Sequence, residues 1–466
     1  PVSAPALGAG GREFESHRPD YQNQAPAMGL FLFPTMTTTL SDQHSITPHA
    51  KRALIAGMVG NVLEWYDFGI YGYVATIIAQ QFFPQGDSLA ALLATYGVFA
   101  AGFIMRPVGG VLFGYFGDKY GRKNALILSI ILMAVPTVSM GLLPTYEQIG
   151  LFAPALLTLM RLLQGLSLGG EYTGSVSYLV EHAPPSKRGL FGSWATFAGI
   201  GGILLGSAVG ALLTNTLSKQ EIIEWGWRLP FLGGIFIAAI GGYMRRGLHE
   251  SEMFKNLKIE GKVTQNPLTE ALTTYRTSLL KSVGITATLT ATFYIGFMHI
   301  YLFMNTKIGM ALNEALIGNT IGMCILVALI PVAGIISDHV GRKKVLYFGA
   351  GGIFLFAVPL FYVLQSGNLT DMIIVITAFA LFEAALLGAV ATTLVELFPA
   401  KIRFTAVSLG YNLAIALFGG SAPFYSELLI DTTGSFLMPA LYLILCSALT
   451  LFTLRTIPET YRHPLP

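Results

Sequence analysis

Long apolar stretches separated by short polar connections follow one another along most of the chain. They predict twelve membrane-spanning helices, over residues 53–80, 88–116, 124–144, 150–181, 189–214, 227–246, 279–306, 313–336, 345–365, 371–397, 404–430 and 435–456. Each stretch is close to or longer than the roughly 20 apolar residues that a helix needs to cross a bilayer. The expected fold class is therefore an all-α integral membrane protein with twelve transmembrane helices.

One long charged connection joins the sixth predicted span to the seventh and separates two six-helix halves of similar length. The expected segments are an N-terminal tail (1–50), an N-terminal half (51–246), a cytoplasmic linker (247–278), a C-terminal half (279–456) and a cytoplasmic tail (457–466). The N-terminal tail is polar and irregular, so we expect it to be disordered or foreign to the native protein. Met28 and Met36 are candidate native starts.

Composition supports the membrane assignment. Apolar residues make up 53% of the chain and charged residues 11%, and the mean hydropathy is +0.62. These values exclude a string of soluble domains. The two cysteines form no cluster with histidine, so neither a metal nor a cofactor is expected. Catalytic and nucleotide-binding patterns are missing from the sequence, which argues against an enzyme and against an ATP-driven pump. The expected partners are a small-molecule substrate, protons and the lipid bilayer, without nucleic acid, and the expected state is a monomer.

Lysine and arginine are distributed unevenly over the connections. Arg106 and Arg161 lie within predicted spans. Only three basic residues lie in or beside the connections that follow odd-numbered spans, namely Lys219, Arg228 and Lys307. The remainder lie beside the connections that follow even-numbered spans or near the two ends of the chain. Because positive charge is retained on the cytoplasmic side, both termini are predicted to be cytoplasmic.

An internal repeat relates the two halves. Residues 114–123 read GYFGDKYGRK after the second span, and residues 334–343 read GIISDHVGRK after the eighth. A second pair of motifs shares Leu-Val-Glu, Pro and Arg, at 179–188 and at 394–403. Two duplicated six-helix halves with a binding site between them are a known plan of secondary transporters.

The first repeated motif combines turn-forming glycines with an acid and two bases. The acid can accept hydrogen bonds from a helix N-terminus or pair with an arginine, and the bases hold the loop on the cytoplasmic side. We predict that the motif is a conformational latch, formed by Gly114, Asp118, Gly121, Arg122, Asp338, Gly341 and Arg342. The alternative is a static anchor of the membrane topology.

Four polar residues interrupt the first span: Asn61, Glu64, Asp67 and Tyr71. They recur at i, i+3, i+6 and i+10, which places them on one side of a helix. A charged side chain facing lipid costs roughly 2.5–3.5 kcal/mol at the centre of a span, so both acids should face protein or water. We predict proton coupling by Asp67, or by Glu64 as second choice, and substrate contacts by Asn61 and Tyr71. The alternative is that one acid lies at the membrane surface or pairs statically with an arginine.

The fourth span carries a second polar stripe that includes Arg161, Gln164 and Glu171. Arg161 and Glu171 are about 15 Å apart along a helix axis and are too distant to pair with each other. We expect the stripe to line a central cavity, with Arg161 and Gln164 at the substrate and Arg161 and Glu171 in proton coupling. The alternative for Arg161 is a static ion pair with Glu64 or Asp67.

Weaker candidates for substrate contact lie in the second half. They are Tyr294, His299 and Tyr301 in the seventh span and Tyr411 and Asn412 in the eleventh. The alternative for each is hydrogen-bonded packing between helices, a common use of polar side chains in membranes.

These motifs carry a family resemblance. The repeated G-x-x-x-D-x-x-G-R-K pattern and R-x-x-Q-G in the fourth span resemble the major facilitator superfamily. A narrower set resembles its metabolite:proton symporters, which include bacterial transporters of proline/betaine, α-ketoglutarate, citrate and shikimate. That set comprises NVLEWYDF (61–68), MRPVGG (105–110), QGLSLGGEY (164–172), WGWRLP (225–230), FP (398–399) and FGGSAPF (418–424).

The resemblance implies a transporter of the bacterial inner membrane that imports a small carboxylate or zwitterion together with protons, by alternating access. It also implies that Arg161 lies in the cavity and takes part in proton coupling. One departure is His299, which stands where the family often has a helix-kinking proline. A proton-driven antiporter of the same superfamily is the alternative; the glycine-rich segment 199–210 lacks the proline typical of antiporters, which favours symport.

Overall fold

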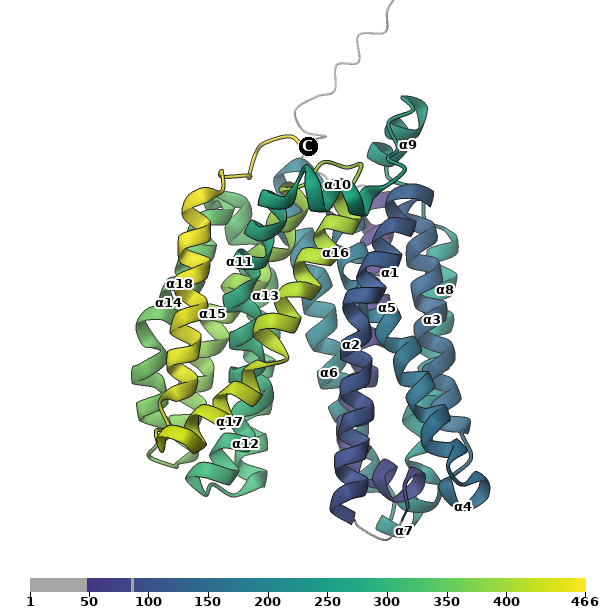
Figure 1. The fold of residues 1–466 in the computed structure, drawn as a ribbon, viewed down its shortest axis with the longest axis vertical. Helices are drawn as coiled ribbons and strands as arrows, with labels where there is room; N and C mark the ends of the chain where they lie inside the picture. Colours follow the sequence, from purple (N-terminus) through teal and green to yellow (C-terminus); the bar gives the residue numbers. More distant parts are fainter. Residues whose placement is uncertain (1–47, 85–87) are drawn as a thin grey trace, which may run out of the picture. The chain divides into compact units, whose positions relative to one another are not determined.

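The computed structural model describes residues 48–84 and 88–466, and every regular element in these residues is helical (Figure 1). The predicted N-terminal tail (1–50) lies outside the described residues except for its last three. The first half contains α1 (Pro48–Phe82), α2 (Ser88–Tyr120), α3 (Arg122–Leu142), α4 (Tyr146–Ile149), α5 (Phe152–His182), η2 (Pro185–Lys187), α6 (Arg188–Thr216), α7 (Lys219–Glu221), η3 (Ile222–Gly226) and α8 (Arg228–Arg246).

The second half begins after two short helices, α9 (Glu252–Ile259) and α10 (Pro267–Thr273), which lie in the predicted linker. Its long elements are α13 (Leu312–Val340), α14 (Arg342–Leu364), α15 (Leu369–Glu396) and α18 (Met438–Thr456). Two further spans are each built from consecutive helices with π-helical turns among them. The first run consists of α11 (Arg276–Phe293), η4 (Tyr294–His299), α12 (Ile300–Phe303) and η5 (Met304–Ile308). The second run consists of α16 (Arg403–Ala414), η6 (Ile415–Gly419) and α17 (Ala422–Thr433).

Each predicted span coincides with one helix or with one such run of helices. Within the described residues, nine helices are long and apolar enough to cross a membrane. The number rises to ten if the segment formed by α7 and η3 and the helix α8, which meet at a bend of 53°, together make one span. The helices α1 and α2 lie outside that number, but at 35 and 33 residues they exceed the length that a bilayer requires. They pack along α6 and α5 inside the first half.

The two ends of the bundle differ in charge. The linker helices α9 and α10, the C-terminus and the loops after the even-numbered spans lie at the upper end in Figure 1, which we call the basic end. The short helices α4, α7 and α12 lie at the opposite end.

The halves pack against each other through α2 with α16 and through α6 with α13. Two glycines of the repeated motif allow this close approach at the basic end. A Cβ on Gly114 would lie 2.6 Å from the Cα of Thr405, and one on Gly334 would lie 2.8 Å from the carbonyl oxygen of Gly189. Any larger residue at either position would push the halves apart.

Candidate functional site

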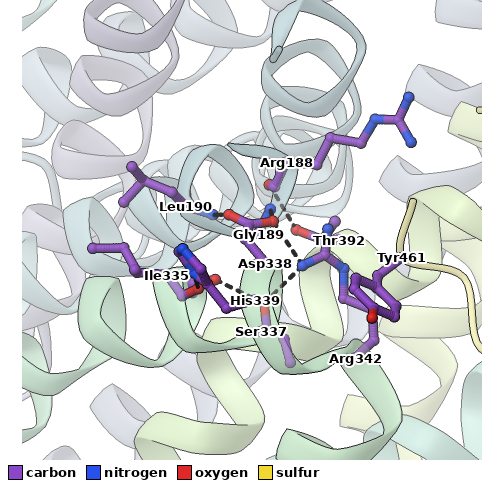
Figure 2. Close-up of polar contacts among 12 residues, drawn as sticks. Arg188, Gly189, Leu190, Ile335, Ser337, Asp338, His339, Arg342, Thr392 and Tyr461 are labelled. Atoms are coloured by element: carbon purple, nitrogen blue, oxygen red, sulfur yellow. Dashed lines mark hydrogen bonds and ion pairs between the residues drawn. The ribbon is translucent and has the colours of Figure 1, made fainter. Parts of the chain in front are cut away.

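The acids of the repeated motif each bind the opposite half. The carboxylate of Asp118 accepts hydrogen bonds from the backbone N–H groups of Phe404 (3.1 Å) and Thr405 (2.8 Å), at the start of α16. The carboxylate of Asp338 accepts them from Gly189 (2.7 Å) and Leu190 (2.9 Å), at the start of α6 (Figure 2). Each acid therefore caps a helix N-terminus, where unpaired N–H groups and the helix dipole favour negative charge.

Arginines of the same motif extend these caps into a network. Arg122 pairs with Asp118 at 3.2 Å and approaches Glu181 at 3.5 Å. Arg403, from the second half, also pairs with Glu181, at 2.8 Å. These side chains are all buried, so the network is an interior contact between the halves.

The second copy of the motif repeats this arrangement. Arg342 pairs with Asp338 at 2.8 Å and with Glu396 at 3.3 Å, and Arg188 of the first half approaches Glu396 at 3.9 Å. The second pair of repeated motifs, which supplies Glu181, Arg188, Glu396 and Arg403, therefore completes the network begun by the first. Among the predicted latch residues, Gly121 and Gly341 end α2 and α13 with φ of +108° and +105°, a conformation that glycine adopts without strain.

Sequence reasoning missed two acids of this region. The carboxylate of Glu250 accepts hydrogen bonds from the backbone N–H groups of Arg122 and Lys123, at the start of α3. Glu459 does the same for Arg342 and Lys343, at the start of α14. A sequence pattern could have pointed to them: each acid is followed by a hydroxyl residue, as Glu-Ser and as Glu-Thr, shortly after the sixth and the twelfth predicted spans. Burial raises the pKa of Glu250, against the effect of its hydrogen bonds.

Four predicted site residues meet inside the first half. Asp67 and Arg161 form a buried ion pair. The side-chain amide of Gln164 donates to Asp67 (2.9 Å) and to Thr137 (2.8 Å), and Arg161 donates to the amide oxygen of Gln164 (2.7 Å). The guanidinium of Arg161 lies 3.7 Å from the ring centroid of Tyr71. The carboxylate partner of Arg161 in this conformation is therefore Asp67, one of the two alternatives that the sequence left open.

Glu171 and Asn61 lie apart from this group. Glu171 forms a buried ion pair with Arg245 of α8 and accepts a hydrogen bond from the hydroxyl of Ser129. Sequence reasoning did not single out Arg245, which stands at the end of the sixth span. The amide of Asn61 donates to the hydroxyl of Ser175 (2.8 Å) and thus joins α1 to α5.

Glu64 and Arg106 are buried side chains that make few polar contacts. Both are 2% exposed or less, and neither carboxylate oxygen of Glu64 has a hydrogen-bond partner among the described residues. The Nε of Arg106 donates to the side-chain oxygen of Asn412 (3.3 Å), while its two terminal nitrogens have no such partner there. The amide of Asn412 donates to the carbonyl of Gly169 (2.8 Å), so Asn412 links α16 to the first half.

A narrow cavity lies between the two halves, and five of its twelve lining residues are aromatic. Its walls include Trp65 and Tyr172 from the first half and Phe293, Tyr294 and Tyr411 from the second. Two of the predicted substrate contacts, Tyr294 and Tyr411, therefore line this cavity. The lining residues do not include Tyr71, Gln164 or Tyr301.

His299 lies away from the cavity lining, within the interrupted seventh span. Its Nε2 is 2.7 Å from a carboxylate oxygen of Glu427 on α17. The other oxygen of Glu427 is 3.0 Å from the ammonium of Lys307. His299 therefore links the seventh predicted span to the eleventh within the second half.

Comparisons with known proteins identify the family. The family described as "Sugar (and other) transporter" matches residues 53–258 and again residues 251–466. The chain belongs to this family of the major facilitator superfamily. The two matches, one for each half, agree with the internal repeat and confirm the predicted all-α fold in two halves. The chain is therefore a multi-pass inner-membrane transporter and not an enzyme.

Several curated relatives are similar over most of their length. The glycine betaine/proline/ectoine/pipecolic acid transporter OusA of Dickeya dadantii is 35% identical over 429 residues, which cover 89% of this chain and 84% of the relative. The proline/betaine transporter of Escherichia coli K12 is 32% identical over 430 residues, which cover 89% and 85%. The putative proline/betaine transporter of Staphylococcus aureus is 35% identical over 407 residues, which cover 86% of each chain.

Among solved structures, the fold matches the major facilitator proton:xylose symporter XylE bound to 6-bromo-6-deoxy-D-glucose. The TM-score is 0.72 at 19% sequence identity, covering 90% of this chain and 98% of XylE. A partially occluded inward-open conformation of XylE from E. coli gives a TM-score of 0.62 at 20% identity, with 90% of this chain covered and all of the other. These matches describe the fold.

Proposed function

We propose that the chain is a proton-coupled symporter that imports a small zwitterion of the proline and betaine type by alternating access. The similarity to three proline/betaine transporters at 32–35% identity supports the substrate class. The placement of lysine and arginine supports a cytoplasmic basic end with both termini there. We propose that a single chain performs the whole transport cycle.

The buried pair of Asp67 and Arg161 is the observation that carries the proton-coupling part of this proposal. An ionised acid inside a membrane protein is stable only next to a compensating charge, and Arg161 supplies it. Protonation of Asp67 neutralises that acid and frees Arg161 to turn toward another carboxylate. Proton binding and the arrangement of the first and fourth spans are coupled in this way.

Alternating access needs a contact that forms in one conformation and breaks in the other. The caps formed by Asp118 and Asp338 join the halves at the basic end. We propose that they close this end while the opposite end is open, and that they separate when the halves rock to release substrate into the cytoplasm. The network is buried, so separation requires water or new partners for its charges.

Transport by the purified chain in proteoliposomes tests this function. Under an inward proton gradient, we expect labelled proline or glycine betaine to accumulate above its external concentration, and a protonophore to abolish the accumulation. Export of the same substrates against an inward proton gradient would instead identify the antiporter. Equal uptake with and without the gradient would overturn proton coupling.

A further inference from the structure

A groove lies on the outer surface of the second half, between α13, α14 and α15. Its volume is about 210 Å³, and ten of its eleven lining residues are apolar. Val332, Ile336 and Phe348 line it and are exposed, in helices that are long and apolar enough to span a membrane. The groove therefore opens toward the hydrocarbon of the bilayer. A space with apolar walls stays dry, so inside a bilayer acyl chains are what can fill it.

The length of the groove matches one leaflet of the bilayer. Along α13 it extends from Leu329 to Val340, which is about 16 Å at the rise of an α-helix. That length is about half of the roughly 30 Å thickness of the hydrocarbon core. Val340 is the last residue of α13, at the basic end, so the groove reaches from that membrane surface to about the middle of the bilayer.

A cation stands at the surface end of the groove. Lys344 lies in the first turn of α14 with an exposed side chain, and it is the one charged residue among the described residues that line the groove. Among the described residues, no carboxylate lies within 4 Å of its ammonium group. Basic groups beside membrane-embedded grooves attract the phosphate of anionic lipids. The groove therefore offers a place for an acyl chain directly next to a partner for its headgroup.

The first half has larger residues at the corresponding positions. The alignment of the repeated motifs pairs three aromatic residues of α2 with three smaller residues of α13: Phe113 with Ala333, Phe116 with Ile336 and Tyr120 with Val340. Phe113 packs in one apolar cluster with Ala125 of α3, and a Cβ on Gly170 of α5 would lie 2.1 Å from the Cβ of Phe113. Phe113 therefore fills space between α2, α3 and α5 that its counterpart Ala333 leaves open in the second half.

The cation also differs between the two copies of the motif. Asn124 follows Gly-Arg-Lys in the first copy, where the second copy has Lys344. The first half forms the same helices with Asn124 and Phe113, so the fold of the repeat needs neither the lysine nor the open space. Two features that occur together in the second copy of the repeat indicate a separate role for this surface.

We propose that this groove binds one anionic glycerophospholipid, with an acyl chain between α13, α14 and α15 and the headgroup phosphate on Lys344. The chain supplies the van der Waals contacts that walls next to a void would lack, and the phosphate accepts a charge-assisted hydrogen bond from the ammonium group. The bound lipid packs against α13, the helix that carries Asp338 of the latch. This site is separate from the cavity between the halves.

Photo-crosslinking in lipid nanodiscs that hold the full-length chain tests this site. The two probes carry the same diazirine-labelled acyl chain, one on phosphatidylglycerol and one on phosphatidylcholine, and each is a minor component of phosphatidylcholine discs. We expect the phosphatidylglycerol probe to label residues 329–348 and 381–385 about fivefold more than the other probe, because one lysine near the membrane surface favours an anionic lipid by about that factor. Residues 112–128, the counterpart in the first half, should show no such preference.

The variants copy residues that the first half already carries. Lys344→Asn should reduce labelling by the phosphatidylglycerol probe about fivefold, to the level of the phosphatidylcholine probe, and leave the latter unchanged. Lys344→Arg keeps the charge and should keep the preference. Ala333→Phe combined with Ala385→Gly reproduces the packing of Phe113 on Gly170, and should reduce labelling of the groove by both probes.

Equal labelling of the groove by the two probes, in the wild type and in Lys344→Asn, would mean that ordinary boundary lipid fills it and would overturn the site. The proposal is also wrong if neither probe labels the groove, or if two copies of the chain in one disc cover it. Substrate uptake is no part of this measurement, so its result is independent of the proposed transport function.

Discussion

Asp67 and Arg161, which are 94 positions apart in the sequence, form an ion pair inside the first half. Gln164 holds both members of the pair, and the ring of Tyr71 covers the guanidinium. The pair therefore fixes α1 against α5.

Asp67→Asn should separate proton coupling from substrate movement. Asparagine has almost the same shape but cannot carry a proton, so accumulation driven by a proton gradient should be lost. Exchange of labelled for unlabelled substrate needs no net proton movement and should remain in part. Both are measured in the same proteoliposomes. Substrate accumulation by the variant against its gradient would contradict the role of Asp67.

The stability of this pair should depend on both partners. Removing one member of a buried ion pair destabilises a protein by roughly 3–5 kcal/mol, because the other charge is left uncompensated. We expect Asp67→Asn to lower thermal stability, and the double variant with Arg161→Gln to recover part of the loss. Additive losses in the double variant would show that the two groups do not interact.

The caps at the basic end should control the conformational equilibrium. Asp118→Asn and Asp338→Asn each weaken two hydrogen bonds to a charged acceptor, worth roughly 1.5–3 kcal/mol apiece. Spin labels at Asn124 and Lys344, which are exposed at the starts of α3 and α14, report the distance between the halves at this end. We expect a longer distance to become more populated in either variant. An unchanged distance distribution would favour the static topology anchor.

The positions and lengths of the helices could largely be predicted from the sequence, but the side-chain ion pairs between the helices could not. Each apolar stretch coincides with a helical element, because bilayer thickness sets the length of a span. The polar stripe of α1 is buried throughout, as its spacing predicted. The sequence could not choose between Glu64 and Asp67 as the partner of Arg161, because the choice depends on how far α5 is shifted along α1.

Other contacts depend on helices whose neighbours the sequence does not specify. Arg245 pairs with Glu171 only because α8 packs beside the first-half core at that depth. Glu250 and Glu459 lie outside the predicted spans, in segments that fold back onto the starts of α3 and α14. Arg106 was visible as a charge within a span, but only the packing shows that no carboxylate of the described residues lies within 4 Å of it.

Gly114→Ala should disturb the contact between the halves. A Cβ there would lie 2.6 Å from the Cα of Thr405, which is backbone and cannot move aside by rotation. Overpacking of this kind costs about 1–3 kcal/mol. This overpacking destabilises the conformation that is closed at the basic end, so we expect that end to open more often. The distance between the same two spin labels measures this opening. Gly351→Ala is the control, because a Cβ there meets nothing within 4 Å. Equal behaviour of the two variants would contradict the prediction.

Glu250 should make stability depend on pH in a direction set by its burial. Burial raises the pKa of this carboxyl above its ordinary value of 4.5, so the folded state keeps the proton to a higher pH than the unfolded chain. Between these two pKa values, folding becomes less favourable as pH rises. Glutamine cannot titrate, so the melting temperature of Glu250→Gln relative to wild type should increase with pH across this window.

Glu252→Gln provides the comparison of opposite sign. The hydrogen bond from Lys255 lowers the pKa of the exposed Glu252, so the wild-type carboxylate favours folding more as pH rises toward 4.5. The melting temperature of this variant relative to wild type should therefore fall with pH, over a lower range than for Glu250→Gln. The same trend in both variants would mean that burial does not govern the titration of Glu250.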